Sequence, residues 1–88
     1  MTAPTREEVL DRIRTHLSEE LGIDEAIIAE PSRFKEDLDA DSLDLVELVV
    51  ELEDRYGIRM AEDQAEKIKT VGQAVDFVLA QSSVNPTP

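Results

Sequence analysis

The hydroxyl group of Ser42 has the clearest potential for covalent chemistry in this sequence. Ser42 follows Asp41 and opens a run of apolar and acidic residues that is typical of a helix. A serine nucleophile needs a positioned base, and the only histidine, His16, lies in the middle of a different predicted helix. The sequence also has no Gly-x-Ser-x-Gly turn and no glycine-rich phosphate loop. We therefore expect that this chain is not an enzyme.

Two roles for Ser42 fit a position at the start of a helix. As a helix cap, its side chain would accept a hydrogen bond from a free backbone N–H, a role that Asp41 could also fill. As the attachment point of a phosphoester, it would place an anion at the positive end of the helix dipole. The nearby Asp39, Asp41 and Asp44 would repel that anion. Local physics alone therefore favours the cap.

The acidic residues around Ser42 suggest a test for a calcium site. Asp37, Asp39 and Asp41 match the first three acidic positions of an EF-hand loop. Counted from Asp37, Ser42 stands where the turn requires glycine, and Leu48 stands where the loop requires glutamate. The sequence therefore predicts no EF-hand and no dedicated metal site. Weak binding of divalent cations by the clustered carboxylates is left open.

Charge and composition restrict the partners and the location of the chain. Nine basic and 21 acidic residues among 88 give a formal net charge of −12, and residues 36–54 hold nine of the acids and no basic residue. Such a chain repels nucleic-acid phosphates, so we expect protein partners with basic surfaces. The absence of cysteine excludes disulfides and thiolate metal sites. No apolar run approaches the ~20 residues of a membrane span, and the first residues do not resemble a signal peptide, so we predict a cytoplasmic location.

Capping and stop residues divide the chain into helices. Thr5 with Glu8, and Thr70 with Gln73, have the spacing of capping boxes that begin helices. The predicted elements are a first helix ending at Gly22, a short turn near 24–29, a second helix over about 42–56, a short helix over about 61–68 and a last helix after Thr70. The fold class is all-α, a small four-helix bundle of three main helices plus one short helix, with a long loop after the first helix. The expected domain covers residues 5–81, with flexible tails at 1–4 and 82–88.

The helix predicted from Ser42 has two apolar stripes, although a small bundle needs only one. Projected at about 100° per residue, the first stripe can face the core and consists of Leu45, Val49, Leu52 and Tyr56, flanked by Leu48. The second stripe consists of Leu43, Val46 and Val50, and it adjoins the carboxylates of Asp44, Glu47, Glu51 and Asp54. Two interpretations stand side by side. The second stripe packs beneath the long loop, or it is an exposed docking strip for a basic partner.

Two stretches of the sequence resemble the acyl carrier protein family. Residues 37–49, Asp-Leu-Asp-Ala-Asp-Ser-Leu-Asp-Leu-Val-Glu-Leu-Val, resemble the family's Asp-Ser-Leu signature. Residues 65–72, Ala-Glu-Lys-Ile-Lys-Thr-Val-Gly, resemble the stretch that precedes its last helix. The similarity extends over about residues 5–81 in length, acidity and helix order. On this resemblance the chain is identified as a freestanding member of the fatty-acid-synthase type.

The resemblance implies a cofactor and a set of partners. A phosphopantetheinyl transferase would attach 4′-phosphopantetheine from coenzyme A to Ser42, between Asp41 and Leu43, and the thiol of the arm would carry acyl intermediates as thioesters. The further partners would be basic-surfaced acyl-processing enzymes, namely a ketosynthase, a ketoreductase, a dehydratase, an enoyl reductase and an acyltransferase. The implied docking face consists of Leu43, Asp44, Val46, Glu47, Val50, Glu51 and Asp54. We expect the carrier to be a monomer.

The resemblance also implies an acyl pocket, made of residues that any core would use. The pocket would be lined by Phe34, Leu45, Val49, Leu52, Met60, Ala65, Ile68, Ala74 and Phe77. The sequence departs from the family at Asp39, where many members have glycine, and at Leu45 and Val50, where Thr or Ser and Met are common. These departures leave the cargo open between fatty acid, polyketide and specialised acyl groups. An alternative of a different class is an unmodified acidic adaptor that binds a basic partner through the second stripe.

Overall fold

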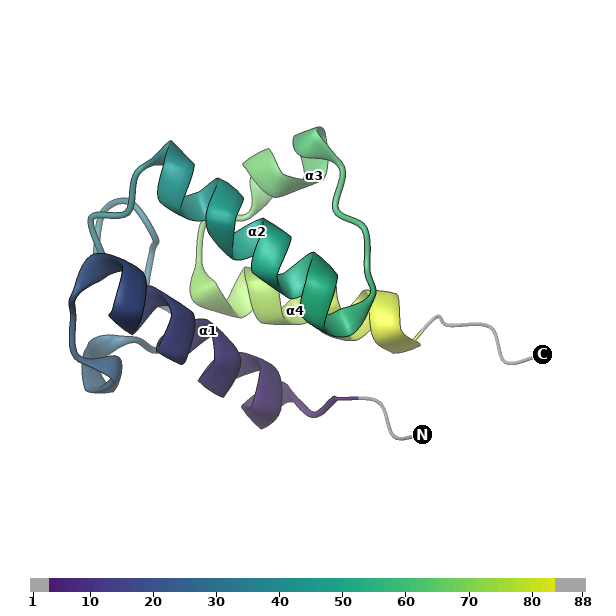
Figure 1. Cartoon of the computed structure of the whole chain (residues 1–88), viewed down its shortest axis with the longest axis horizontal. Helices are drawn as coiled ribbons and strands as arrows, with labels where there is room; N and C mark the ends of the chain where they lie inside the picture. The colour runs from purple at the N-terminus through teal and green to yellow at the C-terminus, as the bar shows by residue number, and fades with distance from the viewer. Residues whose placement is uncertain (1–3, 84–88) are drawn as a thin grey trace.

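The computed structural model describes residues 4–83 and contains five helical segments in that range. They are α1 (Arg6–Leu21), the 3-10 turn η1 (Glu25–Ile27), α2 (Ser42–Tyr56), α3 (Glu62–Lys67) and α4 (Val71–Ser83), as Figure 1 shows. Within these residues there is no strand, and β geometry is confined to a single bridge between Arg33 and Thr70. The prediction of an all-α fold with three main helices and one short helix is confirmed.

The last described helix extends slightly past the predicted end of the domain. α4 continues to Ser83, two residues beyond the predicted end of the domain at residue 81. The remainder of the predicted C-terminal tail and residues 1–3 of the N-terminal tail lie outside the described residues. No helix within residues 4–83 has the length and apolar composition that crossing a lipid bilayer requires.

The helices begin and end at the residues that the sequence marks. The hydroxyl of Thr5 accepts a hydrogen bond from the Glu8 amide at 3.1 Å, which starts α1. Gly22 and Gly57 have φ angles of 68° and 64°, the left-handed conformation that ends α1 and α2 without a Cβ clash. These local signals are why the predicted boundaries agree closely with the structure.

One aliphatic core joins α1, α2, α4 and the loop after α1. Its helical members are Val9, Leu10, Ile13 and Leu17 of α1, Leu48 and Leu52 of α2, and Val71, Ala74, Val75 and Val78 of α4. Leu48, expected only to flank the core, is 2% exposed. Leu45 and Val49, expected at the centre of the core stripe, are half-buried. α2 therefore buries Leu52 of its first stripe together with the flanking Leu48, whereas Leu45 and Val49 remain half-buried.

The long loop between α1 and α2 packs onto the helices, as its apolar residues suggest. Ile28, Phe34 and Leu38 are buried in the core. The Phe34 amide donates a hydrogen bond to the Lys69 carbonyl at 3.0 Å, and the Gly72 amide donates to the Glu30 carbonyl at 2.8 Å. The backbone of the loop is therefore fixed to the segment that leads into α4.

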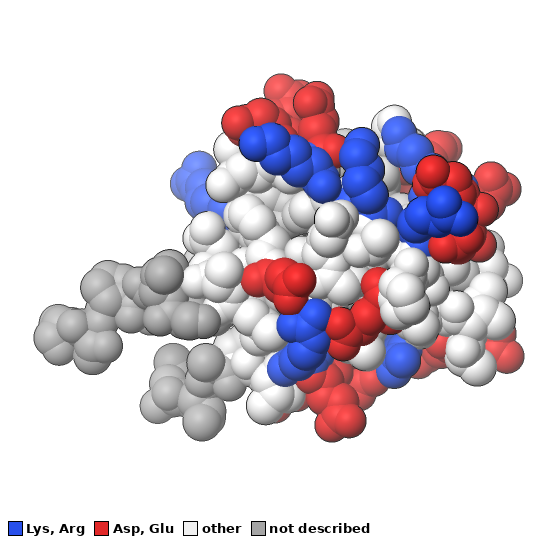
Figure 2. All heavy atoms as spheres, turned by 180° about the vertical axis from the view of Figure 1, so that it is seen from behind, with Lys and Arg blue, Asp and Glu red and all other residues white. Residues whose placement is uncertain are grey.

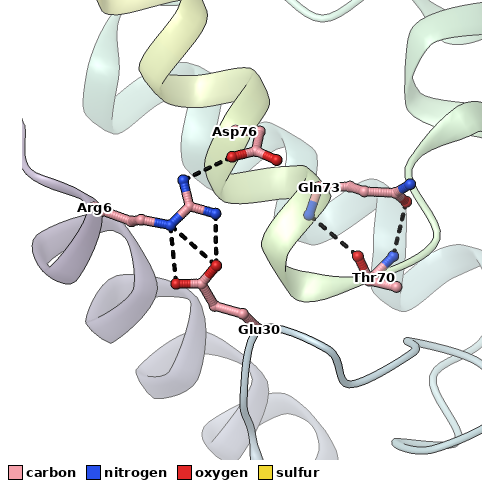
Figure 3. Close-up of polar contacts among 5 residues, drawn as sticks. All are labelled: Arg6, Glu30, Thr70, Gln73 and Asp76. Carbon is pink, nitrogen blue, oxygen red and sulfur yellow. Dashed lines mark hydrogen bonds and ion pairs between the residues drawn. The ribbon is translucent and has the colours of Figure 1, made fainter.

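An ion-pair network joins the start of α1, the loop and α4. The Arg6 guanidinium donates from Nε to Glu30 Oε2 at 2.9 Å and from Nη1 to Asp76 Oδ1 at 2.7 Å (Figure 3). The side-chain hydrogen bonds with Glu30 and Asp76 raise the pKa of Arg6, and the hydrogen bond from Arg6 lowers the pKa of Glu30. Figure 3 also shows the reciprocal hydrogen bonds between Thr70 and Gln73 that begin α4, at 3.1 and 3.2 Å.

Candidate functional site

Ser42 is the first residue of α2, and its side chain is exposed. The N-cap of the helix is Asp41, whose Oδ1 accepts a hydrogen bond from the Asp44 amide at 3.0 Å. The Asp44 carboxylate in turn accepts from the Asp41 amide at 3.0 Å, which completes a capping box. Among the described residues the Ser42 hydroxyl makes no hydrogen bond, so it does not cap the helix. The structure therefore leaves this hydroxyl accessible to an enzyme that would modify it.

The capping box also affects the ionisation of Asp41. The hydrogen bond from the Asp44 backbone amide is the main cause that lowers the pKa of Asp41 below its ordinary value. The carboxylate is thereby kept charged beside Ser42. An anion attached to Ser42 would experience repulsion from this charge together with attraction from the free amides of the helix N-terminus.

The second stripe is exposed. Leu43, Val46 and Val50 are 65%, 57% and 48% exposed, which is unusual for large apolar side chains in so small a domain. The interpretation that this stripe packs beneath the long loop is therefore wrong. The loop instead covers the core with Ile28, Phe34 and Leu38.

Carboxylates from two helices meet next to the second stripe. The carboxylate oxygens of Glu20 in α1 and of Asp44 and Glu47 in α2 lie within 4.8 Å of one another. A side-chain hydrogen bond with Glu20, followed by repulsion from its charge, raises the pKa of Glu47 above its ordinary value. The sequence analysis did not include Glu20, because no local pattern shows that the end of α1 lies against the start of α2.

A groove of about 940 Å³ lies between α2 and α3, and we call it the α2–α3 groove. Eight of the nine residues predicted for the acyl pocket line it, namely Phe34, Leu45, Val49, Leu52, Met60, Ala65, Ile68 and Ala74. Ser42 also belongs to its lining, and so do Val46 and Val50 of the second stripe. The groove, the second stripe and the candidate attachment residue thus form one continuous site.

Phe77 is the predicted pocket residue that the structure places elsewhere. It lies one turn beyond Ala74 in α4 and lines a separate shallow hollow together with Gln64 and Gln73. The family resemblance assigned Phe77 to the pocket together with Ala74. Its half-buried ring instead lies outside the α2–α3 groove, so Phe77 is not part of that lining.

The residues of this site fit a group that is linked through a phosphodiester and ends in an apolar chain. The exposed hydroxyl of Ser42 supplies the oxygen for the ester. The groove that Ser42 helps to line has an apolar part in which an apolar chain would be removed from water, and charged side chains also belong to its lining.

Comparison with known proteins agrees with this geometry. A family model described as a phosphopantetheine attachment site matches residues 11–78. The acyl carrier protein of Rubrobacter xylanophilus is 49% identical over 74 residues, which cover 84% of this chain and 91% of that protein. The acyl carrier protein of Lactobacillus johnsonii is 46% identical over 74 residues, covering 84% and 92%. In a solved structure, the acyl carrier protein of Enterococcus faecalis is 40% identical with a TM-score of 0.77, covering 90% of this chain and 100% of that one.

Proposed function

The chain belongs to the acyl carrier protein family, and we propose that it carries acyl groups as thioesters on a 4′-phosphopantetheine arm attached to Ser42. The observation that carries this proposal is the exposed hydroxyl of Ser42, which lines the α2–α3 groove. Asp41 caps the helix, so the Ser42 hydroxyl is not needed as a cap. The bound arm would supply the thiol that forms the thioester, in a chain that has no cysteine. The chain itself would act as a carrier and not as a catalyst.

The second stripe and its carboxylates support a docking role. Leu43, Val46 and Val50 expose apolar surface, and Asp44, Glu47, Glu51 and Asp54 supply negative charge on the same helix. A partner with a basic surface and a shallow apolar groove would be steered by the charges and held by the apolar contacts. The partners that fit are a phosphopantetheinyl transferase and the enzymes that process acyl groups in dissociated fatty acid synthesis.

The α2–α3 groove supports a role in sheltering the cargo. The apolar part of its lining combines the thioether of Met60 with aliphatic side chains and the ring of Phe34. Such side chains can repack around an acyl chain without leaving polar groups unpaired. Leu45, where the family often has a hydroxyl residue, would make the wall of the groove more apolar.

The test is the intact mass of the protein before and after incubation with coenzyme A and a broad-specificity phosphopantetheinyl transferase. We expect the wild type to gain one phosphopantetheine and Ser42→Ala to gain none. Ser32→Ala is the matched control, because Ser32 lies in the loop before α2, and it should gain the same mass as the wild type. Modification of Ser42→Ala, or a folded wild type that gains nothing, would contradict the proposal. The second of these outcomes would favour an unmodified acidic adaptor.

A further inference from the structure

One side-chain hydrogen bond fixes the start of the segment that forms α3. The Met60 amide donates to Glu53 Oε2 at 2.8 Å. Glu53 is half-buried in the last turn of α2, and Met60 directly precedes Ala61, the N-cap of α3. Both Glu53 and Met60 line the α2–α3 groove. The Glu53 carboxylate therefore holds the start of one wall of the groove against the other wall.

The two ends of α3 are held differently. Within residues 4–83, the Glu53–Met60 bond is the only hydrogen bond that joins residues 59–61 to an element other than α3. Beyond the other end of α3, the Lys69 carbonyl accepts from the Phe34 amide at 3.0 Å, and the Lys69 amide donates to Gln73 Oε1 at 2.6 Å. The end of α3 is thus tied to both the long loop and α4, whereas its start depends on one carboxylate.

α3 itself offers little resistance to movement. Five of its six residues are exposed, and Ala65 is half-buried. Figure 2 shows charged side chains of both signs along the upper edge of the molecule, where α3 lies in Figure 1. Such side chains remain solvated whether or not α3 lies against α2. The position of α3 therefore depends mainly on what holds its two ends.

The start of α3 lies at the end of the groove that is far from Ser42. α2 and α3 run in opposite directions (Figure 1), so the start of α3 lies near the last turn of α2. Ser42 is the first residue of α2. An acyl chain that enters the groove beside Ser42 would therefore reach Met60 last, and only if the chain is long.

We propose that Glu53 sets the length of acyl chain that the α2–α3 groove accepts, as a positioning residue that acts through Met60. This inference rests on the function proposed above and names the residue that limits its cargo. A chain that fits the groove leaves the Glu53–Met60 bond intact. A longer chain displaces Met60, breaks this bond and moves the start of α3 outward, while the end of α3 stays fixed at Lys69. Burial of about two to four more methylene groups offsets the loss of one hydrogen bond to a charged group.

The test compares the wild type with Glu53→Ala, each carrying a butanoyl, octanoyl, dodecanoyl or octadecanoyl thioester. The rate of thioester cleavage by hydroxylamine measures how well each chain is sheltered. In the wild type, cleavage should become slower with chain length until the groove is filled. In Glu53→Ala, the octadecanoyl thioester should be cleaved about fivefold more slowly than in the wild type, because no hydrogen bond opposes the movement of α3. The butanoyl thioester should be cleaved at the same rate in both proteins.

Two control variants separate the hydrogen bond from the charge. Glu53→Gln keeps a carbonyl oxygen that can accept from the Met60 amide, so it should retain the wild-type dependence on chain length. Glu19→Ala makes the same truncation at an exposed residue of α1 outside the groove and should match the wild type. The proposal would be overturned if Glu53→Gln behaved like Glu53→Ala, if Glu53→Ala matched the wild type, or if Glu53→Ala changed cleavage equally at all four lengths.

Amide hydrogen exchange in the wild type gives a second measurement that needs no variant. The Met60 amide should exchange about fivefold faster with an octadecanoyl chain than with an octanoyl chain, because the longer chain breaks the bond to Glu53. The Phe34 amide, bonded to Lys69 at the fixed end, should exchange equally with both chains. Equal exchange at Met60, or faster exchange at Phe34, would overturn the inference while the carrier function still stood. A wild type that gains no phosphopantetheine would refute the carrier function and this inference together.

Discussion

Asp41 and Asp44 exchange hydrogen bonds in both directions across Ser42. Each backbone amide donates to the other side chain at 3.0 Å. The two carboxylates thereby hold the first turn of α2 in place and leave the hydroxyl between them unbonded among the described residues. The helix start that presents Ser42 is consequently built from groups other than Ser42 itself.

The capping box makes a prediction about the acid stability of the protein. Because the pKa of Asp41 is lowered in the folded state, its contribution to stability is present above the unfolded pKa of about 3.9 and is lost as the pH falls through the folded value. Asp41→Asn keeps a good cap that does not titrate, so the melting temperature of this variant should fall less than that of the wild type between about pH 5 and pH 2. An equal fall of the melting temperature with decreasing pH in wild type and variant would contradict this account.

Loss of the cap itself is tested by Asp41→Ala. The amide of Asp44 would lose its acceptor, and the melting temperature at pH 7 should fall by about 5 °C. Thermal unfolding followed by circular dichroism measures this change. Asp41→Asn at the same pH is the matched control and should remain close to the wild type.

The contact between Glu20 and Glu47 predicts a stabilising substitution. The pKa of Glu47 is raised, so its favourable contribution is present at low pH and is lost as the pH rises through the folded value. Glu47→Gln imitates the protonated form and should raise the melting temperature by a few degrees at pH 7 but not below about pH 4. Glu51→Gln is the control, because Glu51 pairs with Arg55 at 3.2 Å, and it should give no increase. A decrease for Glu47→Gln at pH 7 would contradict the prediction.

Asp39 gives a prediction about the backbone. Its φ of 58° makes it the only non-glycine residue with positive φ among the described residues. Asp39→Gly should stabilise the fold by about 0.5–1 kcal/mol, because the left-handed conformation is free of strain in glycine. Asp39→Asn removes the charge but keeps a side chain at this position. Its free energy of unfolding, measured in urea, should therefore rise less than that of Asp39→Gly. Equal gains for both variants would assign the effect to charge alone.

Leu43 and Leu48 provide a matched pair on α2, because the same truncation is made at 65% and at 2% exposure. Leu48→Ala should reduce the free energy of unfolding by about 2–5 kcal/mol, since it leaves a cavity in the core. Leu43→Ala should change stability by less than about 0.5 kcal/mol but slow the transfer of phosphopantetheine to the protein. Urea unfolding and the rate of mass gain measure the two effects. An unchanged rate for Leu43→Ala would exclude this side chain from docking to the transferase.

Most of the fold could be predicted because its boundaries depend on local signals. Thr5, Gly22, Gly57 and Thr70 mark helix ends through their own backbone and side-chain chemistry. Spacing within α2 also showed that a second apolar stripe exists, but not that this stripe is exposed. Which interpretation of that stripe was correct depended on where the loop lies, and spacing within α2 carries no information about that.

The remaining features depend on contacts between segments far apart in the sequence. Glu20 meets Glu47 only because α1 and α2 pack side by side, and Phe34 meets Lys69 only because the loop pairs with the segment before α4. The location of Phe77 beside Gln64 and Gln73 likewise depends on which elements pack next to α4.

The six residues of α3 contribute no side chain to the buried core, although they form one wall of the α2–α3 groove. Displacement of α3 would therefore cost little of the packing between α1, α2 and α4. A longer acyl chain could then be accommodated by displacement of α3 alone, while α1, α2 and α4 kept their arrangement. Under the proposed function, thermal stability and cargo capacity would be governed by separate parts of this 88-residue chain, so one could change during evolution without the other.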